Sequence, residues 1–206
     1  MRRSLWLGAD SLILASGSSA RAQLLASIAI PFVVVKPQVD ERAVEEPLIA
    51  EKAAPQEIAQ ALADAKALDV SAMMSGRFVL GGDQVLELEG EILHKPQDRD
   101  EAKIHLQRLS NKTHALHSAA TLVRDGKVVA QAYDVARLTM RILDDAFLET
   151  YLNAAGDAVL SSVGAYQIEG LGQHLFEKVE GNPATIMGLP LFALLREMRV
   201  LDLVRA

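Results

Sequence analysis

The stretch LILASGSSARAQLLASIAIPFVVVKPQVDE, residues 12–41, decides the fold. Its first four residues are apolar and predict a buried strand, which the small residues 16–19 interrupt. Leu24, Leu25 and Ile28 then recur on one face of a helix. Pro31 ends that helix before a second strand at residues 32–35. A strand, a polar turn, a helix and a further strand together predict a mixed α/β fold.

The turn between the first strand and the helix is a candidate anion site. Free N–H groups and the positive end of the helix dipole point at such a turn. The hydroxyl of Ser18 and the guanidinium of Arg21 suit phosphate oxygens. Alternatively, Ser18 or Ser19 only caps the helix and Arg21 is solvated. Both readings stay open at this point, because the turn lacks a full glycine-rich fingerprint.

Composition narrows the class of protein. With 206 residues, of which 50% are hydrophobic, the chain can bury a sizeable core in one domain or two joined lobes. Only 4% of the residues are aromatic and the net charge is −6, which argues against a nucleic-acid partner. The chain has no cysteine, which excludes disulfides, thiol nucleophiles and cysteine metal sites and favours the cytoplasm.

The N-terminus faintly imitates a signal peptide, because Arg2 and Arg3 precede a run of apolar residues. Asp10 interrupts that run, and residues 12–16 are needed for the first strand, so we expect no cleaved signal. The chain also has no apolar stretch of the length that spans a bilayer, and we expect no membrane partner.

Further along the chain, local patterns predict most of the remaining elements. Residues 42–54 are acidic, contain Pro47 and predict a mobile connection. Pro55 is well placed to begin a helix that extends to about residue 69 and carries Lys66. Other expected elements are a helix capped by Asp98 and ending at residue 109, two strands over residues 113–141 around a turn at 124–127, a helix capped by Asp144 and ending at Gly156, and a last helix from Pro190.

Residues 78–88, FVLGGDQVLEL, place an acidic side chain inside an apolar stretch. Burying Asp83 is costly unless it has a partner or a task. Gly81 and Gly82 lack side chains, so a ligand or another backbone can approach them closely. The alternative is an aspartate at a loop end beside a β-bulge.

Three separated blocks resemble the Maf family of nucleoside triphosphate pyrophosphatases. They are LASGSSARAQLL with VDE at 39–41, the stretch GGDQVL followed by ILHKP, and residues 163–189, VGAYQIEGLGQHLFEKVEGNPATIMGL. The resemblance implies an inosine-triphosphatase-like fold, in which a mixed elongated sheet is flanked by helices. It further implies a single domain over residues 1–206, with two closely joined lobes around a central cleft and a homodimeric assembly.

The resemblance also implies roles for individual residues. The reaction would convert a nucleoside triphosphate into a monophosphate and pyrophosphate. Asp83 would be the proton acceptor, with Glu41 and Lys95 as further catalytic residues. Asp83 and Glu41 would hold a divalent cation, Mg²⁺ or alternatively Mn²⁺, through oxygen ligands. The expected substrate-binding residues are Ser18, Arg21, Lys66, Gln84 and Glu169. Without the resemblance, Lys66 would be read as a surface lysine.

Departures from the family pattern bear on the substrate. Members that hydrolyse dTTP and UTP carry S-P-R-R, D-T and I-Q-G, whereas this chain has SSAR, DQ and IEG. The branch of 7-methyl-GTP pyrophosphatases is similar to this chain at these positions. A carboxylate at Glu169 accepts the two adjacent donors of a guanine edge and repels a carbonyl of uracil or thymine. We therefore expect a modified purine nucleotide such as 7-methyl-GTP as substrate. The alternatives are a dTTP/UTP-type pyrophosphatase and a nucleotide-binding regulator of septum formation without important catalysis.

Overall fold

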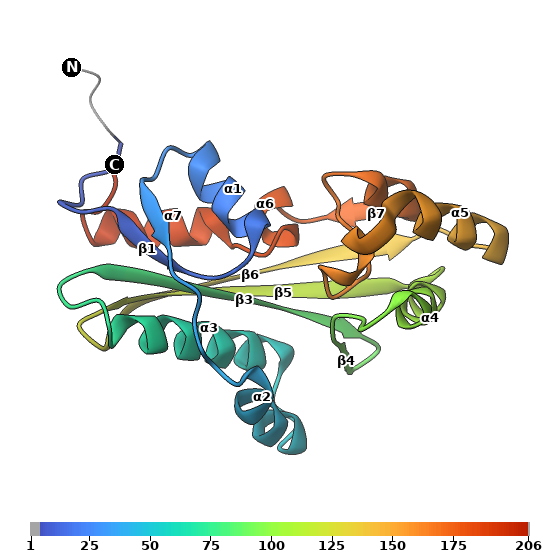
Figure 1. Ribbon diagram of the computed structural model, residues 1–206, viewed down its shortest axis with the longest axis horizontal. Coiled ribbons are helices and arrows are strands. Elements are labelled where there is room, and N and C mark those ends of the chain that lie inside the picture. The colour runs from blue at the N-terminus through green and yellow to red at the C-terminus, as the bar shows by residue number, and fades with distance from the viewer. Residues whose placement is uncertain (1–4, 206) are drawn as a thin grey trace. The chain divides into compact units, whose positions relative to one another are not determined.

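The computed structural model describes residues 5–205 and has a mixed α/β fold (Figure 1). Arg2 and Arg3, which carry the signal-like pattern, lie outside the described residues. The strands are β1 (Leu12–Ala15), β2 (Phe32–Val34), β3 (Phe78–Leu88), β4 (Glu91–Leu93), β5 (Thr113–Arg124), β6 (Lys127–Met140) and β7 (Phe176–Glu180). The α-helices are α1 (Ser19–Ser27), α2 (Glu41–Ala50), α3 (Pro55–Ser71), α4 (Arg99–Leu109), α5 (Asp145–Ala155), α6 (Pro183–Ile186) and α7 (Leu191–Val200).

The strands form one sheet of seven strands in the order β2-β1-β3-β5-β6-β7, with β4 paired to β3. β1 runs parallel to both β2 and β3, whereas β3 and β4, and likewise β6 and β7, are antiparallel. The expected mixed sheet flanked by helices is therefore confirmed. Within residues 5–205, every helix is too short or too polar to cross a lipid bilayer.

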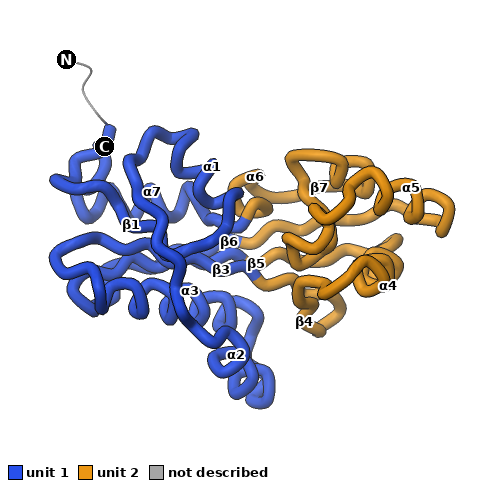
Figure 2. The backbone as a smooth tube through the Cα atoms, viewed as in Figure 1, with its two compact units in different colours: residues 1–84, 118–134, 188–206 blue, residues 85–117, 135–187 orange. Residues whose placement is uncertain are grey.

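By its internal contacts the chain divides into two compact units, coloured separately in Figure 2. Unit 1 contains residues 1–84, 118–134 and 188–206, and unit 2 contains residues 85–117 and 135–187. In unit 1, α1 and α7 lie on one face of β1 and β3, and α3 lies on the other (Figure 1). A cluster of apolar side chains joins α3 to the sheet in this unit: Ile13, Ala15, Ala67, Val70, Val79 and Val123.

Helix α3 approaches β3 closely because β3 carries glycine there. A methyl group on Gly81 would lie 2.3 Å from the carbonyl oxygen of Ala63 and 2.8 Å from the backbone nitrogen of Ala67. The expectation that another backbone would approach this glycine pair is thus confirmed at Gly81. Asp83, two residues after Gly81, does not lie at a loop end, because β3 continues through it without a break to Leu88.

Several predicted element ends agree with the structure. Asp98 and Asp144 cap α4 and α5 by accepting hydrogen bonds of 2.8 Å from the backbone N–H groups three residues on. The turn between β5 and β6 has positive φ at both Asp125 and Gly126, the conformation of a tight two-residue hairpin. Pro55 begins α3 as expected.

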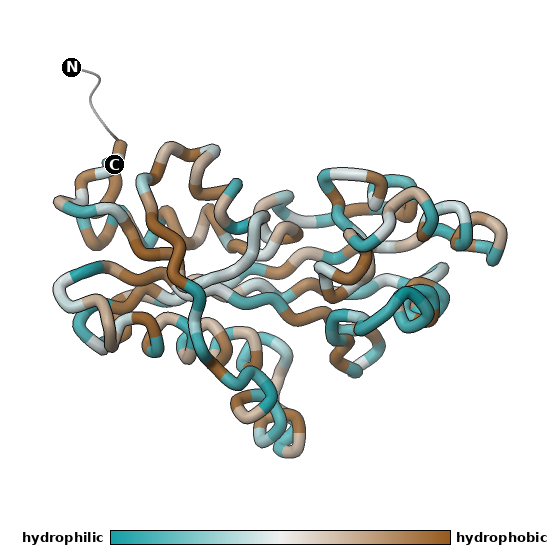
Figure 3. The backbone as a smooth tube through the Cα atoms, in the orientation of Figure 1, coloured by the Kyte–Doolittle hydropathy of each residue, from teal (hydrophilic) through white to brown (hydrophobic). Residues whose placement is uncertain are grey.

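The prediction of a mobile connection over residues 42–54 is wrong, because residues 41–50 form helix α2. Asp40 caps this helix by accepting a bond of 3.2 Å from the backbone of Ala43. The helix buries none of its residues and contains Pro47, a residue that disfavours a helix interior, so the segment did not indicate a helix. Its contacts are with α3. Figure 3 shows the hydropathy changing from the apolar β2 to the polar segment that leads into α2.

Unit 2 has its own core, to which β3, β6, α4 and α5 contribute Leu86, Leu138, Leu106 and Leu148, respectively. His114 on β5 lies inside this core with 1% of its surface exposed, and its Nε2 is 2.7 Å from the hydroxyl of Tyr166. Burial lowers the pKa of His114 from 6.5 to about 4. The imidazole is therefore neutral in the folded protein at neutral pH.

We expect His114 to make folding pH-dependent. Below pH 6.5 the unfolded chain takes up a proton at this histidine, while the folded chain does so only near pH 4. Stability is therefore lost as the pH falls from 6.5 to 4, by about 3 kcal/mol for this group. Urea unfolding across that range should show a smaller loss in His114→Gln than in the wild type. Equal losses in the two proteins would contradict the assignment.

Candidate functional site

The first group of candidate residues lies in unit 1, where the parallel strands β1 and β2 end. Ala15 at the end of β1 pairs with Gly81, so β3 continues past the end of β1 beside residues 16–18. The neighbouring β2 ends at Val34, two residues before Lys36. In open α/β sheets, ligands bind outside the carboxyl ends of parallel strands. Ser18 follows the end of β1 and Lys36 follows the end of β2. Asp83 lies on the part of β3 that extends beyond the end of β1.

Ser18 is the N-cap of α1, and its hydroxyl accepts a bond of 3.4 Å from the backbone N–H of Arg21. The backbone N–H of Ser18 itself donates to the Ser16 hydroxyl at 3.2 Å. Capping by Ser18 is therefore confirmed, whereas Ser19 is the first residue of the helix and not its cap.

Arg21 is not solvated, because only 9% of its surface is exposed. Its Nε donates to the carbonyl oxygen of Gly188 at 2.7 Å, and its Nη1 donates to the Ser16 hydroxyl at 3.2 Å. Both acceptors are uncharged. Burial lowers the pKa of Arg21, and the negative charges of Asp83 and Glu41 act in the opposite direction. A buried guanidinium held by neutral acceptors is well suited to a bound anion.

Lys66 lies at the centre of the acidic residues. Its Nζ is 2.5 Å from Oδ1 of Asp83 and 2.7 Å from Oε1 of Glu41. The side chains of Lys66 and Asp83 are 7% and 11% exposed, whereas Glu41 at the start of α2 is 56% exposed. The reading of Lys66 as a surface lysine is therefore wrong: α3 buries it against β3, where two carboxylates balance its charge.

The two carboxylates suit a hard divalent cation. Glu41 and Asp83 each place one oxygen against the ammonium of Lys66, so the two carboxylates lie close to each other. No group of three or more potential metal-ligating side chains occurs in the described part of the chain. Mg²⁺ is commonly held by only one or two carboxylates together with substrate phosphates. The pair thus fits such an ion when a phosphate-bearing ligand completes its coordination.

Gln84 follows Asp83 on β3, and its amide donates to the Ser118 hydroxyl at 3.0 Å. The adjacent Gly82 leaves room for Arg21, whose Nε would lie 3.2 Å from a methyl group at that position. Gly188, with φ +95°, supplies the carbonyl that holds Arg21. Sequence reasoning did not identify Gly188, and the only signal was its place in the last family block.

Lys36 is a second residue that the sequence did not single out. Its aliphatic carbons pack over Gly17, with Cε 3.7 Å from where a methyl group on that glycine would lie. Pro37 follows it and favours an extended backbone at Lys36. No ion pair involves Lys36 within residues 5–205. Its charged end is therefore free at the turn that precedes α1.

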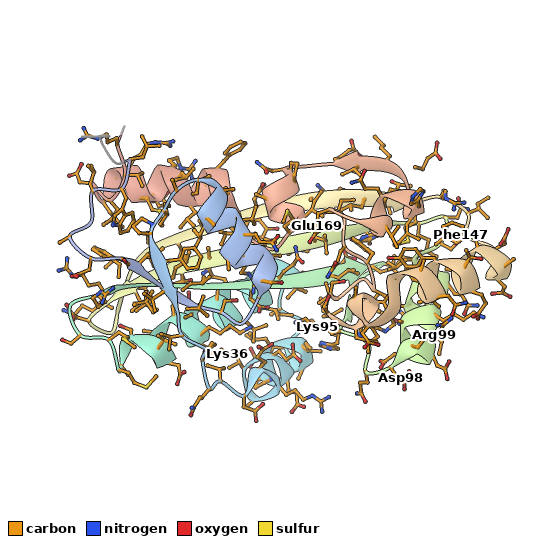
Figure 4. All side chains as sticks on the ribbon, turned by 45° about the horizontal axis from the view of Figure 1, so that its top comes forward. Lys36, Lys95, Asp98, Arg99, Phe147 and Glu169 are labelled. Atoms are coloured by element: carbon orange, nitrogen blue, oxygen red, sulfur yellow. The ribbon has the colours of Figure 1, made fainter. Side chains whose placement is uncertain are left out.

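Two predicted residues, Lys95 and Glu169, belong to unit 2, and both are labelled in Figure 4. Lys95 is exposed just after β4, next to the buried Pro96. Glu169 is exposed in the loop before the short 3-10 helix η2 (Leu171–Leu175). Gly172 of η2 packs closely against this loop, because a methyl group there would lie 2.4 Å from the carbonyl oxygen of Gln167.

Glu169 borders a cavity of about 450 Å³ in unit 2. The cavity lies among η2, β7 and α6, and its wall is part apolar and part charged. The residues that line it are Ile168, Glu169, Gln173, Phe176, Glu177, Lys178, Val179, Pro183, Ile186 and Met187. Its volume is in the range of small-molecule sites.

Comparisons with known proteins match nearly the whole chain. The family model described as Maf-like protein matches residues 11–201. A nucleoside triphosphate pyrophosphatase of Nitrobacter winogradskyi is 48% identical over 196 residues, which cover 95% of this chain and 96% of that protein. A 7-methyl-GTP pyrophosphatase of Brucella abortus is 50% identical over 188 residues, which cover 91% and 94%. A nucleoside triphosphate pyrophosphatase of Rhodopseudomonas palustris is 50% identical over 196 residues.

The matched region contains all three sequence blocks and every candidate residue described above. The chain belongs to the Maf-like protein family.

Proposed function

We propose that this protein is a nucleoside triphosphate pyrophosphatase that prefers a modified purine nucleotide such as 7-methyl-GTP. The observation that carries the proposal is the cluster of Lys66, Asp83 and Glu41 beside the buried Arg21, at the ends of parallel strands. This cluster offers cations for phosphates and carboxylates for a metal ion and a proton. The names of the relatives, nucleoside triphosphate pyrophosphatase and 7-methyl-GTP pyrophosphatase, support the same activity.

In the proposed reaction, a water oxygen attacks the α-phosphorus and the bond from that phosphorus to the bridging oxygen breaks. Asp83 takes the proton of the water, and pyrophosphate leaves with the bridging oxygen. Arg21, the N–H groups that start α1 and Lys95 stabilise the negative charge of the phosphates. Lys66 positions the carboxylate of Asp83, which it contacts at 2.5 Å.

A divalent cation, Mg²⁺ or Mn²⁺, completes the proposal, with Asp83 and Glu41 as its protein ligands. Such an ion would neutralise phosphate charge in the transition state. The base of the nucleotide is assigned to Gln84 and Glu169, and Ser18 is assigned to the phosphates. We also propose that the protein is cytoplasmic and has neither nucleic acid nor a membrane as a partner, as its composition led us to expect. The family resemblance supports a homodimer.

The activity is tested by measuring pyrophosphate release from 7-methyl-GTP, GTP, ITP, dTTP, UTP and 5-methyl-UTP, with Mg²⁺ and with excess chelator. Turnover that is fastest for 7-methyl-GTP and lost with chelator would support the proposal. Turnover confined to dTTP and UTP would keep the reaction and remove the purine preference. Absence of any turnover would instead favour the nucleotide-binding regulator.

Replacing Glu169 by glutamine is expected to narrow the preference for guanine over uracil nucleotides by about a hundredfold. The carboxylate accepts two donors of a guanine edge, whereas an amide also offers a donor to the carbonyls of uracil. The measurement is kcat/KM for 7-methyl-GTP and UTP in both proteins. An unchanged ratio would remove the basis for assigning the purine preference to this residue.

Replacing Lys36 by methionine is expected to raise KM for the preferred nucleotide about fivefold, with a smaller effect on kcat. Methionine keeps the apolar stem over Gly17 but removes the free charge beside the proposed phosphate site. Lys127→Met is the matched control, since Lys127 is an exposed lysine of unit 1 at the start of β6. Equal KM values in the two variants would exclude a role for Lys36.

A further inference from the structure

The cavity of unit 2 combines one aromatic ring with two carboxylates. Phe176, Glu169 and Glu177 all line it, together with the side chains of Ile168, Val179, Ile186 and Met187. An aromatic face and nearby carboxylates are the groups that attract an organic cation. Apolar side chains beside them can accommodate a methyl group.

Phe176 is held in place by other rings. Its ring packs edge-on against Tyr166 with 4.8 Å between centroids, and His114 lies 6.1 Å away. His114 and Tyr166 are themselves buried and hydrogen-bonded to each other. The wall that Phe176 contributes to the cavity is therefore preformed rather than adaptable.

Glu177 is placed by an irregularity in the sheet. Thr139 of β6 pairs with Lys178, but the next residue, Met140, pairs with Phe176. Glu177 is thus the extra residue of a β-bulge on β7. Bulges redirect the side chain of the extra residue and are frequent beside active sites.

The charges at the cavity do not cancel. Lys178, the one cation that lines it, contacts Glu180 through Nζ and Oε1 at 2.9 Å. Within residues 5–205, neither Glu169 nor Glu177 is in an ion pair. The lining therefore carries two unpaired carboxylates, and its electrostatic potential favours a positively charged ligand.

We propose that this cavity recognises the positive charge of an N7-alkylated purine base, with Glu177 as a specificity-determining residue. The inference rests on the proposed function and deepens it. Alkylation at N7 places a formal positive charge on the ring system of guanine, which the unmodified base lacks. Glu177 and Phe176 would then distinguish the modified base by its charge, while Glu169 accepts the hydrogen-bond donors of the guanine edge.

The test compares kcat/KM for 7-methyl-GTP, GTP and the triphosphate of 7-methyl-7-deazaguanosine. The last has the methyl group at the same place but no charge on the base. The assays use a pH at which the methylated base keeps its N1 proton. The proteins are the wild type, Glu177→Gln and, as control, Glu149→Gln, which removes a carboxylate from α5 of the same unit away from the cavity lining.

The wild type should favour 7-methyl-GTP over the uncharged analogue by about tenfold or more, and Glu177→Gln should lose most of that preference. The control Glu149→Gln should keep the wild-type preference for 7-methyl-GTP over the uncharged analogue. The inference is wrong if the wild type releases pyrophosphate with equal kcat/KM from the charged and the uncharged methylated nucleotide. It is also wrong if Glu177→Gln keeps the preference for the charged nucleotide. In either case the proposed activity stands. If the wild type hydrolyses none of the nucleotides, the proposed function fails and the inference fails with it.

Discussion

Asp83→Asn is expected to slow pyrophosphate release from the preferred nucleotide by about a thousandfold. The amide cannot take the proton of the attacking water, and a positioned general base contributes about 10²–10⁴ in rate. The change also removes one of the two proposed ligands of the metal ion. Because Lys66 still contacts Glu41 at 2.7 Å, its buried charge keeps a partner, so the variant should fold.

The measurement is single-turnover hydrolysis beside the wild type, with thermal unfolding and binding of a nucleotide analogue whose α–β bridge cannot be cleaved. Asp69→Asn is the control, since this carboxylate of α3 accepts a bond of 2.8 Å from the backbone of Gln38 outside the cluster. Retained binding with lost turnover would support the role of Asp83 in the chemistry. Turnover within tenfold of the wild type would exclude it as the proton acceptor.

Gly81→Ala is expected to destabilise the protein by about 3 kcal/mol, a large fraction of the stability of an ordinary domain. The added methyl group would lie 2.3 Å from the carbonyl oxygen of Ala63, and the obstructing atoms belong to the backbone of α3, which cannot rotate away. Either α3 or β3 must shift, and both carry a member of the Lys66 and Asp83 pair. The variant should therefore lose activity together with stability.

Gly82→Ala is the matched control for this prediction. A methyl group there would meet the side chain of Arg21 at 3.2 Å, and a side chain can adjust by a few tenths of an ångström. Urea unfolding should show a loss below about 1 kcal/mol for Gly82→Ala. Equal losses in the two variants would contradict the argument that backbone contact with α3 requires glycine at residue 81.

Local signals determined much of this fold without tertiary information. Several features could be predicted because each depends on residues within a few positions of one another. They are the apolar strand at residues 12–15, the caps of α4 and α5 and the Asp125-Gly126 turn. The three sequence blocks indicated the family for a related reason, since their residue types and order are properties of the chain itself. Among the candidate residues, Asp83 was conspicuous because an acid stood in an apolar run.

The tertiary structure alone decided what those residues contact. The segment that forms helix α2 is acidic and contains Pro47, so its sequence did not predict a helix. Glu41 on this helix reaches Lys66 because α2 packs against α3. The pairing of Arg21 with Gly188 joins residues that are 167 positions apart, and the bulge that places Glu177 depends on its register with β6. Such contacts follow from how whole elements pack, because burial and strand pairing are properties of surfaces that distant segments form together.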